Sequence, residues 1–197
     1  MMCALDKLQQ LLKENNGIIT TKELAKHNIA RTYLQMLMDK NQLVRVERGV
    51  YCEPSVWDDD MFNLQYRFAR GVFSHNTALF LHGLTDRTPL QYEMTFPQGY
   101  NSSGPKTAFI KLRTVSPTVH NLGVVEKETP SGNKVLTYDV ERTLCDLVKN
   151  NKTDKQVLLP ALKEYISGKE KNISKLMQYA KALKVENKMR TYLEVLL

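Results

Sequence analysis

The sequence of 197 residues has few of the residues that build disulfide or zinc frameworks. Its three cysteines, Cys3, Cys52 and Cys145, form no CxxC pair. An odd number of widely spaced cysteines encodes neither a disulfide framework nor a zinc module, and it indicates a reducing compartment. No stretch approaches the roughly 20 apolar residues that are needed to span a bilayer. We therefore expect a soluble, cytoplasmic protein without a membrane partner.

Sequence signatures of common enzymes are absent as well. There is no GxxxxGK[ST], no GxSxG and no HExxH motif. His75 and His82 are seven positions apart, but a third ligand or a general base is not evident. The acidic run at residues 58–60 could hold a hard cation, yet such a run at the start of a helix is explained by the helix dipole. We predict no enzyme, no catalytic residue, no metal and no cofactor.

The charge is positive and unevenly distributed. The formal net charge is +7. Residues 1–53 contribute +2 (eight Lys/Arg less six Asp/Glu), residues 54–139 contribute zero (eight less eight), and residues 140–197 contribute +5 (twelve less seven). A positive excess favours a polyanionic partner such as nucleic acid.

The first 53 residues have the pattern of a small DNA-binding domain. Helices are predicted over residues 4–15, from Thr20 onward, and over residues 30–40, because apolar side chains recur at helical spacing. The stretch "LVRVERGVY" follows, and valines on both sides of a glycine predict a short hairpin. Three helices followed by a hairpin indicate a winged helix-turn-helix, in which the third helix enters the major groove.

Polar and basic side chains lie where this domain would meet DNA. We expect residues at the second helix and the hairpin to contact phosphates and those of the third helix to reach base edges. The predicted DNA-binding residues are Thr20, Thr21, Lys22, Lys26, Arg31, Thr32, Gln35, Arg45 and Arg48. Arg45 could instead turn toward Glu47 or Glu53, and the whole face could serve protein contact. Because the domain carries only +2, we expect two copies on a symmetric operator, or help from the C-terminal basic region.

Residues 54–197 are predicted to form a second, mixed domain. "SHNTALFLHGLTD" reads as a capped helix and "LQYEMTFP" as a half-buried strand. Further strands and four final helices, the last three over 154–167, 172–184 and 186–197, complete an α+β fold around a small, mainly antiparallel sheet. A second polyanion-binding surface is predicted on the final helices, with an ordinary solvated face as the alternative. Its candidate residues are Lys171, Lys175, Lys181, Lys184, Lys188 and Arg190.

Three stretches together resemble a known family. They are "LVRVERGVY", "FSHNTALFLHGLTD" and "TYDVERTLCDLVK", in which Arg142 and Asp146 are spaced for an i,i+4 ion pair. In this order they resemble the AbiEi family, the antitoxin and transcriptional regulator of bacterial abortive-infection type IV toxin–antitoxin operons. The second and third stretches read physically as packing and capping elements, in which Ser74 and Asp139 can cap helices.

The resemblance implies both a function and partners. An AbiEi protein represses its own operon by binding inverted repeats through its N-terminal winged helix, and its C-terminal domain counteracts AbiEii, a nucleotidyltransferase-like toxin, in phage defence. We expect a monomer in solution with two copies on double-stranded operator DNA. Two alternatives stay open: a plain winged-helix repressor with a ligand-sensing or dimerising C-terminal domain, and a nucleic-acid-acting enzyme with a winged-helix targeting module.

Overall fold

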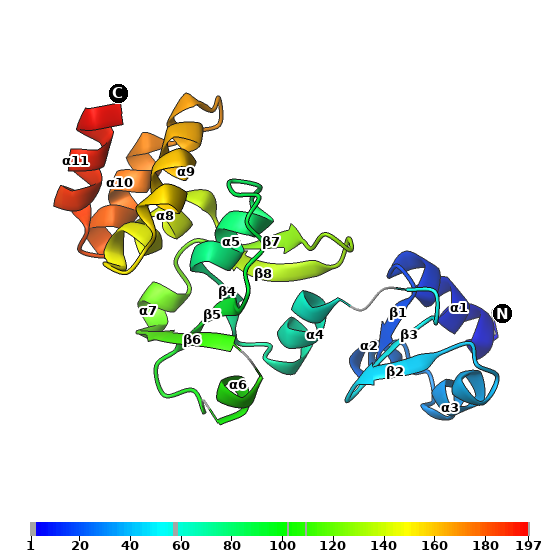
Figure 1. Ribbon diagram of the computed structural model, residues 1–197. Helices are drawn as coiled ribbons and strands as arrows, with labels where there is room; N and C mark the ends of the chain where they lie inside the picture. The colour runs from blue at the N-terminus through cyan, green and yellow to red at the C-terminus, as the bar shows by residue number, and fades with distance from the viewer. Residues whose placement is uncertain (1–2, 57–58, 102, 109, 197) are drawn as a thin grey trace. The chain divides into compact units, whose positions relative to one another are not determined.

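The chain folds into two compact units with helices and a sheet in each. The computed structural model describes residues 3–56, 59–101, 103–108 and 110–196 (Figure 1). Unit 1 comprises Met1–Leu64 with Thr129–Asn133, and unit 2 comprises Gln65–Glu128 with Lys134–Leu197. The predicted α+β class is confirmed. Within the described ranges, no helix has both the length and the apolar character needed to cross a bilayer.

Unit 1 begins with the predicted three helices and hairpin. The helices are α1 (Ala4–Glu14), α2 (Thr21–Lys26) and α3 (Thr32–Asp39), and the hairpin strands are β2 (Val44–Glu47) and β3 (Val50–Cys52). One further strand, β1 (Ile18–Thr20), pairs antiparallel with β3, so that the sheet order is β1-β3-β2. The sequence does not reveal β1, because three residues are too few to show a strand periodicity.

Leucines from the three helices form the core of unit 1. Leu8, Leu12, Leu24, Leu34 and Leu43 are all buried in one cluster. They come from each helix and from the segment that leads into the hairpin. Burying a leucine side chain of this kind contributes about 1.5–3 kcal/mol. The leucines that recur at helical spacing in the sequence are therefore the residues that pack α3 against α1 and α2.

The hairpin turn is tied to the start of α2. Gly49 has a φ of +84°, a left-handed conformation that glycine adopts without the steric penalty of a side chain. Its carbonyl oxygen accepts a hydrogen bond from the backbone N–H of Thr21 at 2.9 Å. The register between β2 and β3 also shifts between Arg45 and Glu47. The turn thus lies beside the helix start instead of projecting freely.

An acidic side chain caps the helix that follows the hairpin in the chain. The carboxylate of Asp59 accepts hydrogen bonds from the backbone N–H of Phe62 (3.0 Å), the hydroxyl of Thr129 (2.5 Å) and the amide of Asn133 (2.9 Å). Helix α4 (Asp60–Arg67) follows. Asp58 lies outside the described residues. Asp59 is therefore a buried cap, and the described part of the chain shows no group of three or more acidic, His or Cys side chains suited to a metal ion.

The sheet of unit 2 is mixed, so the expectation of a mainly antiparallel sheet is wrong. Its strands are β4 (Val72–Phe73), β5 (Tyr92–Pro97), β6 (Ile110–Val115), β7 (Val124–Glu128) and β8 (Lys134–Tyr138), in the order β6-β5-β4-β8-β7. The pairs β5–β6 and β4–β8 are parallel, and the other two are antiparallel. Helix α6 (Ser103–Thr107) lies between β5 and β6 in the chain, which permits the crossover that parallel neighbours need.

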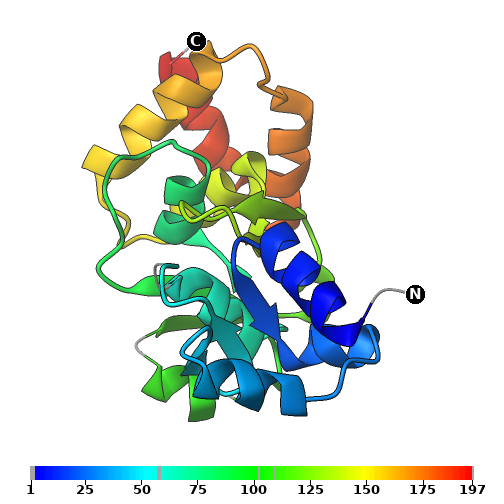
Figure 2. The same ribbon diagram turned by 90° about the vertical axis from the view of Figure 1, so that its right-hand side faces the viewer.

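Helices complete unit 2. Helix α5 (His75–Leu81) follows β4, and α7 (Pro117–His120) follows β6. The chain ends in α8 (Val140–Lys149), α9 (Lys155–Ser167), α10 (Ile173–Ala182) and α11 (Glu186–Leu196), which confirms the last three predicted helices. Figure 2 shows α8 to α11 gathered together, with α5 next to α8. Buried residues of α5 and of these four helices form one apolar cluster.

Candidate functional site

Helix α3 presents the polar face that the sequence predicted. Arg31, Thr32 and Gln35 are exposed, whereas Leu34 and Leu37 are buried. The side-chain amide of Gln35 donates a hydrogen bond to Asp39 at 2.8 Å. This contact orients Gln35 along the exposed face, and it also places a carboxylate there. The geometry leaves the face accessible to a groove, and base contact by these residues stays a prediction.

Thr20 differs from the other predicted DNA-binding residues because it is 4% exposed. Its hydroxyl accepts a hydrogen bond from the backbone N–H of Glu23 (3.2 Å) and donates one to the carboxylate of Glu23 (2.9 Å). That carboxylate also accepts from the backbone N–H of Thr20 at 3.0 Å. This capping box starts α2 and occupies the Thr20 hydroxyl, so Thr20 positions the helix. Thr21 is half-buried, and Lys22 and Lys26 are exposed.

The two hairpin arginines have different surroundings. Both Arg45 and Arg48 are exposed. The Nε of Arg45 donates to the backbone carbonyl of Glu47 at 3.4 Å, so this side chain turns toward Glu47, as one alternative had it. Arg48 lies at the turn, and its backbone N–H donates to the Glu47 carboxylate at 2.9 Å. Arg48 is thus the hairpin cation better placed to meet a phosphate.

Lys175, one of the six C-terminal cations, belongs to an internal ion-pair network. Its ammonium group lies 2.9 Å from Asp139 and 3.1 Å from Glu141. Tyr179 donates a hydrogen bond to Asp139, and Tyr165 donates one to Glu141. Partial burial lowers the pKa of Lys175, but its hydrogen bonds to Asp139 and Glu141 outweigh this and raise the pKa overall. The lysine joins α10 to α8, and its charge is already neutralised by two carboxylates.

The other five cations do not form one uniform surface either. Three of them have partners in unit 2. These are the carbonyl of Ile166 for Lys171 (2.5 Å), the amide oxygen of Asn151 for Lys188 (2.8 Å) and the carboxylate of Glu186 for Arg190 (3.1 Å). Lys181 and Lys184 are exposed. The alternative of an ordinary solvated helix face describes most of this set, and polyanion binding by its exposed members stays a prediction.

The second and third sequence stretches meet in the fold. The Nε2 of His82 lies 2.7 Å from the carbonyl oxygen of Tyr138. Asp139 caps α8 by accepting from the backbone N–H of Arg142, as predicted. The predicted cap at Ser74 is not made by its side chain, because the Ser74 hydroxyl accepts a hydrogen bond from the hydroxyl of Thr95 instead. The two stretches therefore join α5, α8 and the sheet.

Arg142 and Asp146 form the predicted i,i+4 ion pair, at 3.0 Å. The guanidinium of Arg142 is fully buried, donates to the carbonyl oxygens of Val119 (2.6 Å) and Leu122 (2.9 Å), and lies 4.1 Å from the ring centroid of Tyr138. Burial raises the pKa of Asp146, while Arg142 acts in the opposite direction. The spacing of this pair is visible in the sequence, but its burial is not.

Comparisons with known proteins agree with the family resemblance. A family model described as "Transcriptional regulator, AbiEi antitoxin" matches residues 6–54. Among solved structures, the crystal structure of the RV2827C protein from Mycobacterium tuberculosis is similar, with a TM-score of 0.54 and 12% sequence identity over 97% of this chain and 80% of that chain. No curated protein matches the chain. At this identity the structural likeness shows the fold alone.

The family match confirms the resemblance to AbiEi over the N-terminal region. Residues 6–54 contain α1, α2, α3 and the hairpin, with the exposed face of α3. The match supports a general role as an antitoxin and transcriptional regulator. The match does not extend to unit 2.

Proposed function

We propose that this protein is the antitoxin of a type IV toxin–antitoxin system and represses its own operon through residues 1–53, acting as a winged helix-turn-helix. The observation that carries the proposal is the AbiEi match over residues 6–54, the region in which α3 exposes a polar face beside a hairpin. The family description, a transcriptional regulator and antitoxin, favours a regulatory protein that is not an enzyme. Phage defence by abortive infection follows from the same family.

On DNA, α3 would lie in the major groove. Arg31, Thr32 and Gln35 would face base edges, and Gln35 would have to exchange its hydrogen bond to Asp39 for one to a base. Lys22, Lys26 and Arg48 would lie along the backbone, where cations replace condensed counterions and supply affinity that depends on salt. In this arrangement Thr20 positions α2 and does not touch DNA.

Two copies on inverted repeats would compensate for the low charge of each N-terminal domain. The domain carries eight Lys/Arg and six Asp/Glu, a net charge of +2. Phosphate neutralisation supplies much of protein–DNA affinity, so one copy would bind weakly. A pair of copies on a two-fold symmetric operator doubles the number of contacts without new chemistry. We propose that the protein is a monomer in solution and pairs on its operator.

Promoter binding tests the repressor half of the proposal. The full-length protein should shift DNA from its own promoter when two inverted repeats are intact, and should bind at least about tenfold more weakly, about 1.4 kcal/mol, when one repeat is scrambled. A scrambled spacer of unchanged length is the matched control. Equal binding to all three DNAs would contradict operator recognition.

Growth rescue tests the antitoxin half. A nucleotidyltransferase-like reading frame beside this gene should arrest growth when it is expressed alone, and co-expression of the full-length protein should restore growth. A variant that no longer binds the promoter but still restores growth would place antitoxicity in unit 2. If the protein binds its promoter yet fails to restore growth, a plain repressor is the better description.

A further inference from the structure

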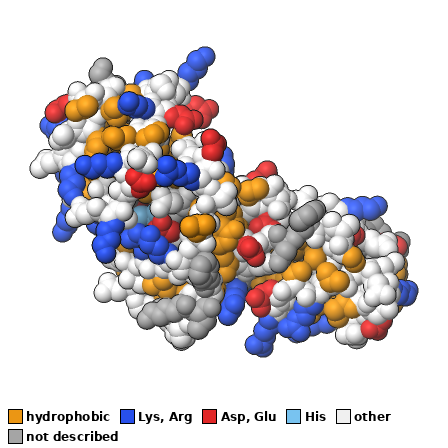
Figure 3. All heavy atoms as spheres, viewed as in Figure 1, with side chains coloured by type: hydrophobic (Ala, Val, Ile, Leu, Met, Phe, Trp, Pro, Cys, Tyr) orange, Lys and Arg blue, Asp and Glu red, His pale blue; other side chains and the backbone are white. Residues whose placement is uncertain are grey.

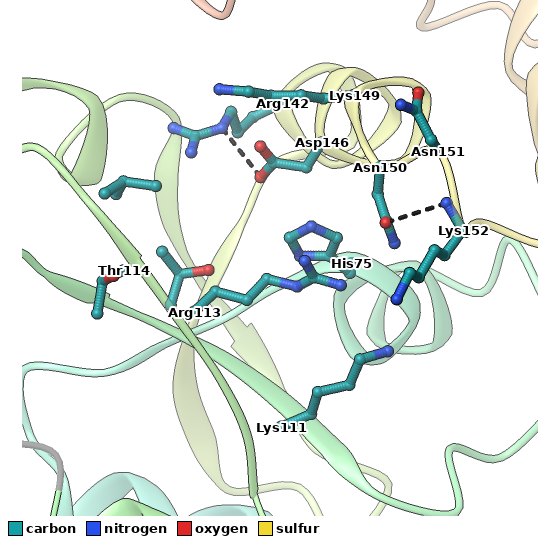
Figure 4. Close-up of a pocket in the computed structure, with 12 residues that line it drawn as sticks. His75, Lys111, Arg113, Thr114, Arg142, Asp146, Lys149, Asn150, Asn151 and Lys152 are labelled. Atoms are coloured by element: carbon teal, nitrogen blue, oxygen red, sulfur yellow. Dashed lines mark hydrogen bonds and ion pairs between the residues drawn. The ribbon is translucent and has the colours of Figure 1, made fainter.

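A basic pocket lies in unit 2. It has a volume of about 650 Å³, in the range of small-molecule sites. Side chains of α5, β5, β6, α8 and the segment after α8 line it. Figure 4 shows the imidazole of His75 in its middle, with Arg113 and Lys111 approaching from the sheet and Lys152 from the segment after α8.

Cations outnumber carboxylates around this pocket. Among the described residues that line it, five are cations and one, Asp146, is acidic. The cations are Lys111, Arg113, Arg142, Lys149 and Lys152. Asp146 is paired with Arg142, and the buried carboxylate of Glu93 contacts Arg113 at 3.1 Å and Lys111 at 3.4 Å. With both carboxylates counted, five cations less two anions still leave +3, and Lys and Arg side chains gather around a hollow on this face in Figure 3.

Two buried nitrogen atoms at the pocket lack hydrogen-bond partners among the described residues. They are Nδ1 of His75 and Nη2 of Arg142. Leaving a buried polar group unsatisfied costs about 1–3 kcal/mol, and more when the group is charged. Their side chains are buried, with relative exposures of 6% for His75 and 0% for Arg142. A ligand acceptor group would satisfy atoms that the protein itself leaves unsatisfied.

His75 also has an unfavourable backbone conformation. Its φ is +53°, in the left-handed region that a histidine adopts at a cost of about 1–3 kcal/mol. Strain of this kind persists where the surrounding structure fixes a side chain in place. Burial, together with Arg113 and Lys111, lowers the pKa of His75 well below its ordinary value. The ring is therefore neutral at pH 7, with one N–H to donate and one nitrogen to accept.

We propose that this pocket binds a small phosphorylated molecule, with a phosphate group held by His75, Arg113 and the lysines of the α8 end. Several cations facing one cavity suit a ligand with more than one negative charge. Guanidinium groups and backbone-fixed N–H donors hold phosphate oxygens in charge-assisted hydrogen bonds. The volume leaves room for more than a single phosphate, so pyrophosphate is the simplest probe of the class.

A single carboxylate is a weaker match to this site. One negative charge would leave most of the cationic excess uncompensated in a partly enclosed site. A phosphate dianion or a pyrophosphate meets three or more donors at once and lowers the repulsion among the lysines. Burial, and then the field of Arg113 and Lys111, lowers the pKa of His75, and a bound anion would oppose that field.

Calorimetric titration of the full-length protein with pyrophosphate and with inorganic phosphate, at constant ionic strength, tests the proposal. The Lys149→Gln, Lys152→Gln double variant should bind pyrophosphate at least about tenfold more weakly, about 1.4 kcal/mol. Both lysines are exposed, so their loss should leave the fold intact. The matched control is Lys155→Gln, Lys163→Gln, which removes the same charge from the exposed surface of α9 and should bind within about twofold of wild type.

A second variant addresses the centre of the pocket. His75→Asn removes the imidazole, and asparagine tolerates a left-handed φ better than most residues, so the fold should persist. We expect an unchanged or higher Tm together with weaker pyrophosphate binding. The proposal is overturned if wild type shows no binding in the millimolar range, or if the pocket variants bind as well as the control. It is also overturned if the same titration with an oligonucleotide shows binding and pyrophosphate shows none, since the pocket would then be part of a nucleic-acid surface.

Discussion

The two units differ in how many of their charged residues are buried. In unit 1 the cations Lys22, Lys26, Arg31 and Arg48 are exposed around an apolar core of leucines. Unit 2 also has exposed lysines, but several of its charged side chains are buried, among them Glu93, Asp146 and Arg142, which has no exposed surface. The first arrangement suits a partner that arrives from solvent and is met by many weak contacts. The second links charge to the packing of helices against a sheet.

This difference determines whether a substitution changes binding alone or changes stability as well. Removing an exposed cation from unit 1 should change DNA affinity while stability shifts by less than about 0.5 kcal/mol. Removing a buried charge from unit 2 leaves its partner without compensation, so stability and function change together. Substitutions in unit 1 therefore test binding cleanly. Those in unit 2 need a conservative partner variant to separate folding from function.

The largest effect is expected at Arg142. Arg142→Ala leaves Asp146 buried without its counter-ion and the carbonyls of Val119 and Leu122 without their donor. Breaking a buried pair from one side costs about 3–5 kcal/mol, which urea unfolding of the full-length protein should show. Arg48→Ala is the exposed counterpart and should remain within about 0.5 kcal/mol of wild type. A loss below about 1 kcal/mol at Arg142 would mean that the buried pair adds little.

The sequence predicted what is encoded locally. The i,i+4 spacing of Arg142 and Asp146 predicted their ion pair. The helical spacing of leucines predicted the helices of unit 1. Non-local contacts are not visible in the sequence. Lys175 is a candidate for the polyanion-binding surface, and its pattern does not show the ion pairs with Asp139 and Glu141, which lie more than 30 positions earlier in the chain. The parallel strand pairs were missed for the same reason, since pairing direction depends on chain crossovers and leaves no periodicity.

The basic pocket was missed because it has no local signature. His75 and Arg142 lie in the two quoted stretches, but Lys111 and Arg113 come from strand β6, whose sequence does not show which cavity they line. Only the β5–β6 pairing and the position of α8 bring these side chains around one cavity. A positive φ at a histidine is likewise invisible in sequence, because it follows from tertiary packing.

The next largest effect concerns base preference at α3. Gln35→Ala should change the preferred base at one operator position, because a bidentate amide contact discriminates by about 1–3 kcal/mol. The control is Gln10→Ala on α1, where the glutamine makes an equivalent exposed contact to Glu14 at 2.7 Å. Competition binding against operators varied at each position measures the preference. Unaltered preference in Gln35→Ala would remove base reading from α3.

A smaller effect is expected at Lys175. Lys175→Met removes the cation shared by Asp139 and Glu141 and should lower the free energy of unfolding by about 1–2 kcal/mol. The expected loss is small for a charged contact because the side chain is 36% exposed and solvent screens its charge. Lys181→Met, on the exposed surface of the same helix, should cost almost nothing. Because the folded-state pKa of Lys175 is raised, its contribution is present below pH 10.5 and is lost as the pH rises through the raised value. Equal stabilities of the two variants would contradict the network.

His75 should make unit 2 sensitive to mild acid. Burial and nearby cations lower its pKa in the folded state, so below pH 6.5 the unfolded chain binds a proton that the folded chain does not. Stability should therefore fall with decreasing pH, by up to about 1.4 kcal/mol per pH unit. His75→Asn should reduce this slope in urea unfolding between pH 6.5 and 5. Part should remain, since burial also lowers the pKa of His82, and an unreduced slope would show that His75 does not titrate as described.

The smallest effect, and the sharpest contrast with unit 2, is expected at Arg48. Arg48→Ala should weaken binding to every DNA sequence alike and reduce the salt slope by about 0.9, the value for one phosphate contact. Arg45→Ala is the matched control on the same hairpin, where Nε is already engaged by the Glu47 carbonyl, and it should change the slope less. Binding titrations at several salt concentrations separate the two. If Arg48→Ala and Gln35→Ala cause equal losses on all sequences, neither residue reads bases, and unit 1 holds DNA by charge alone.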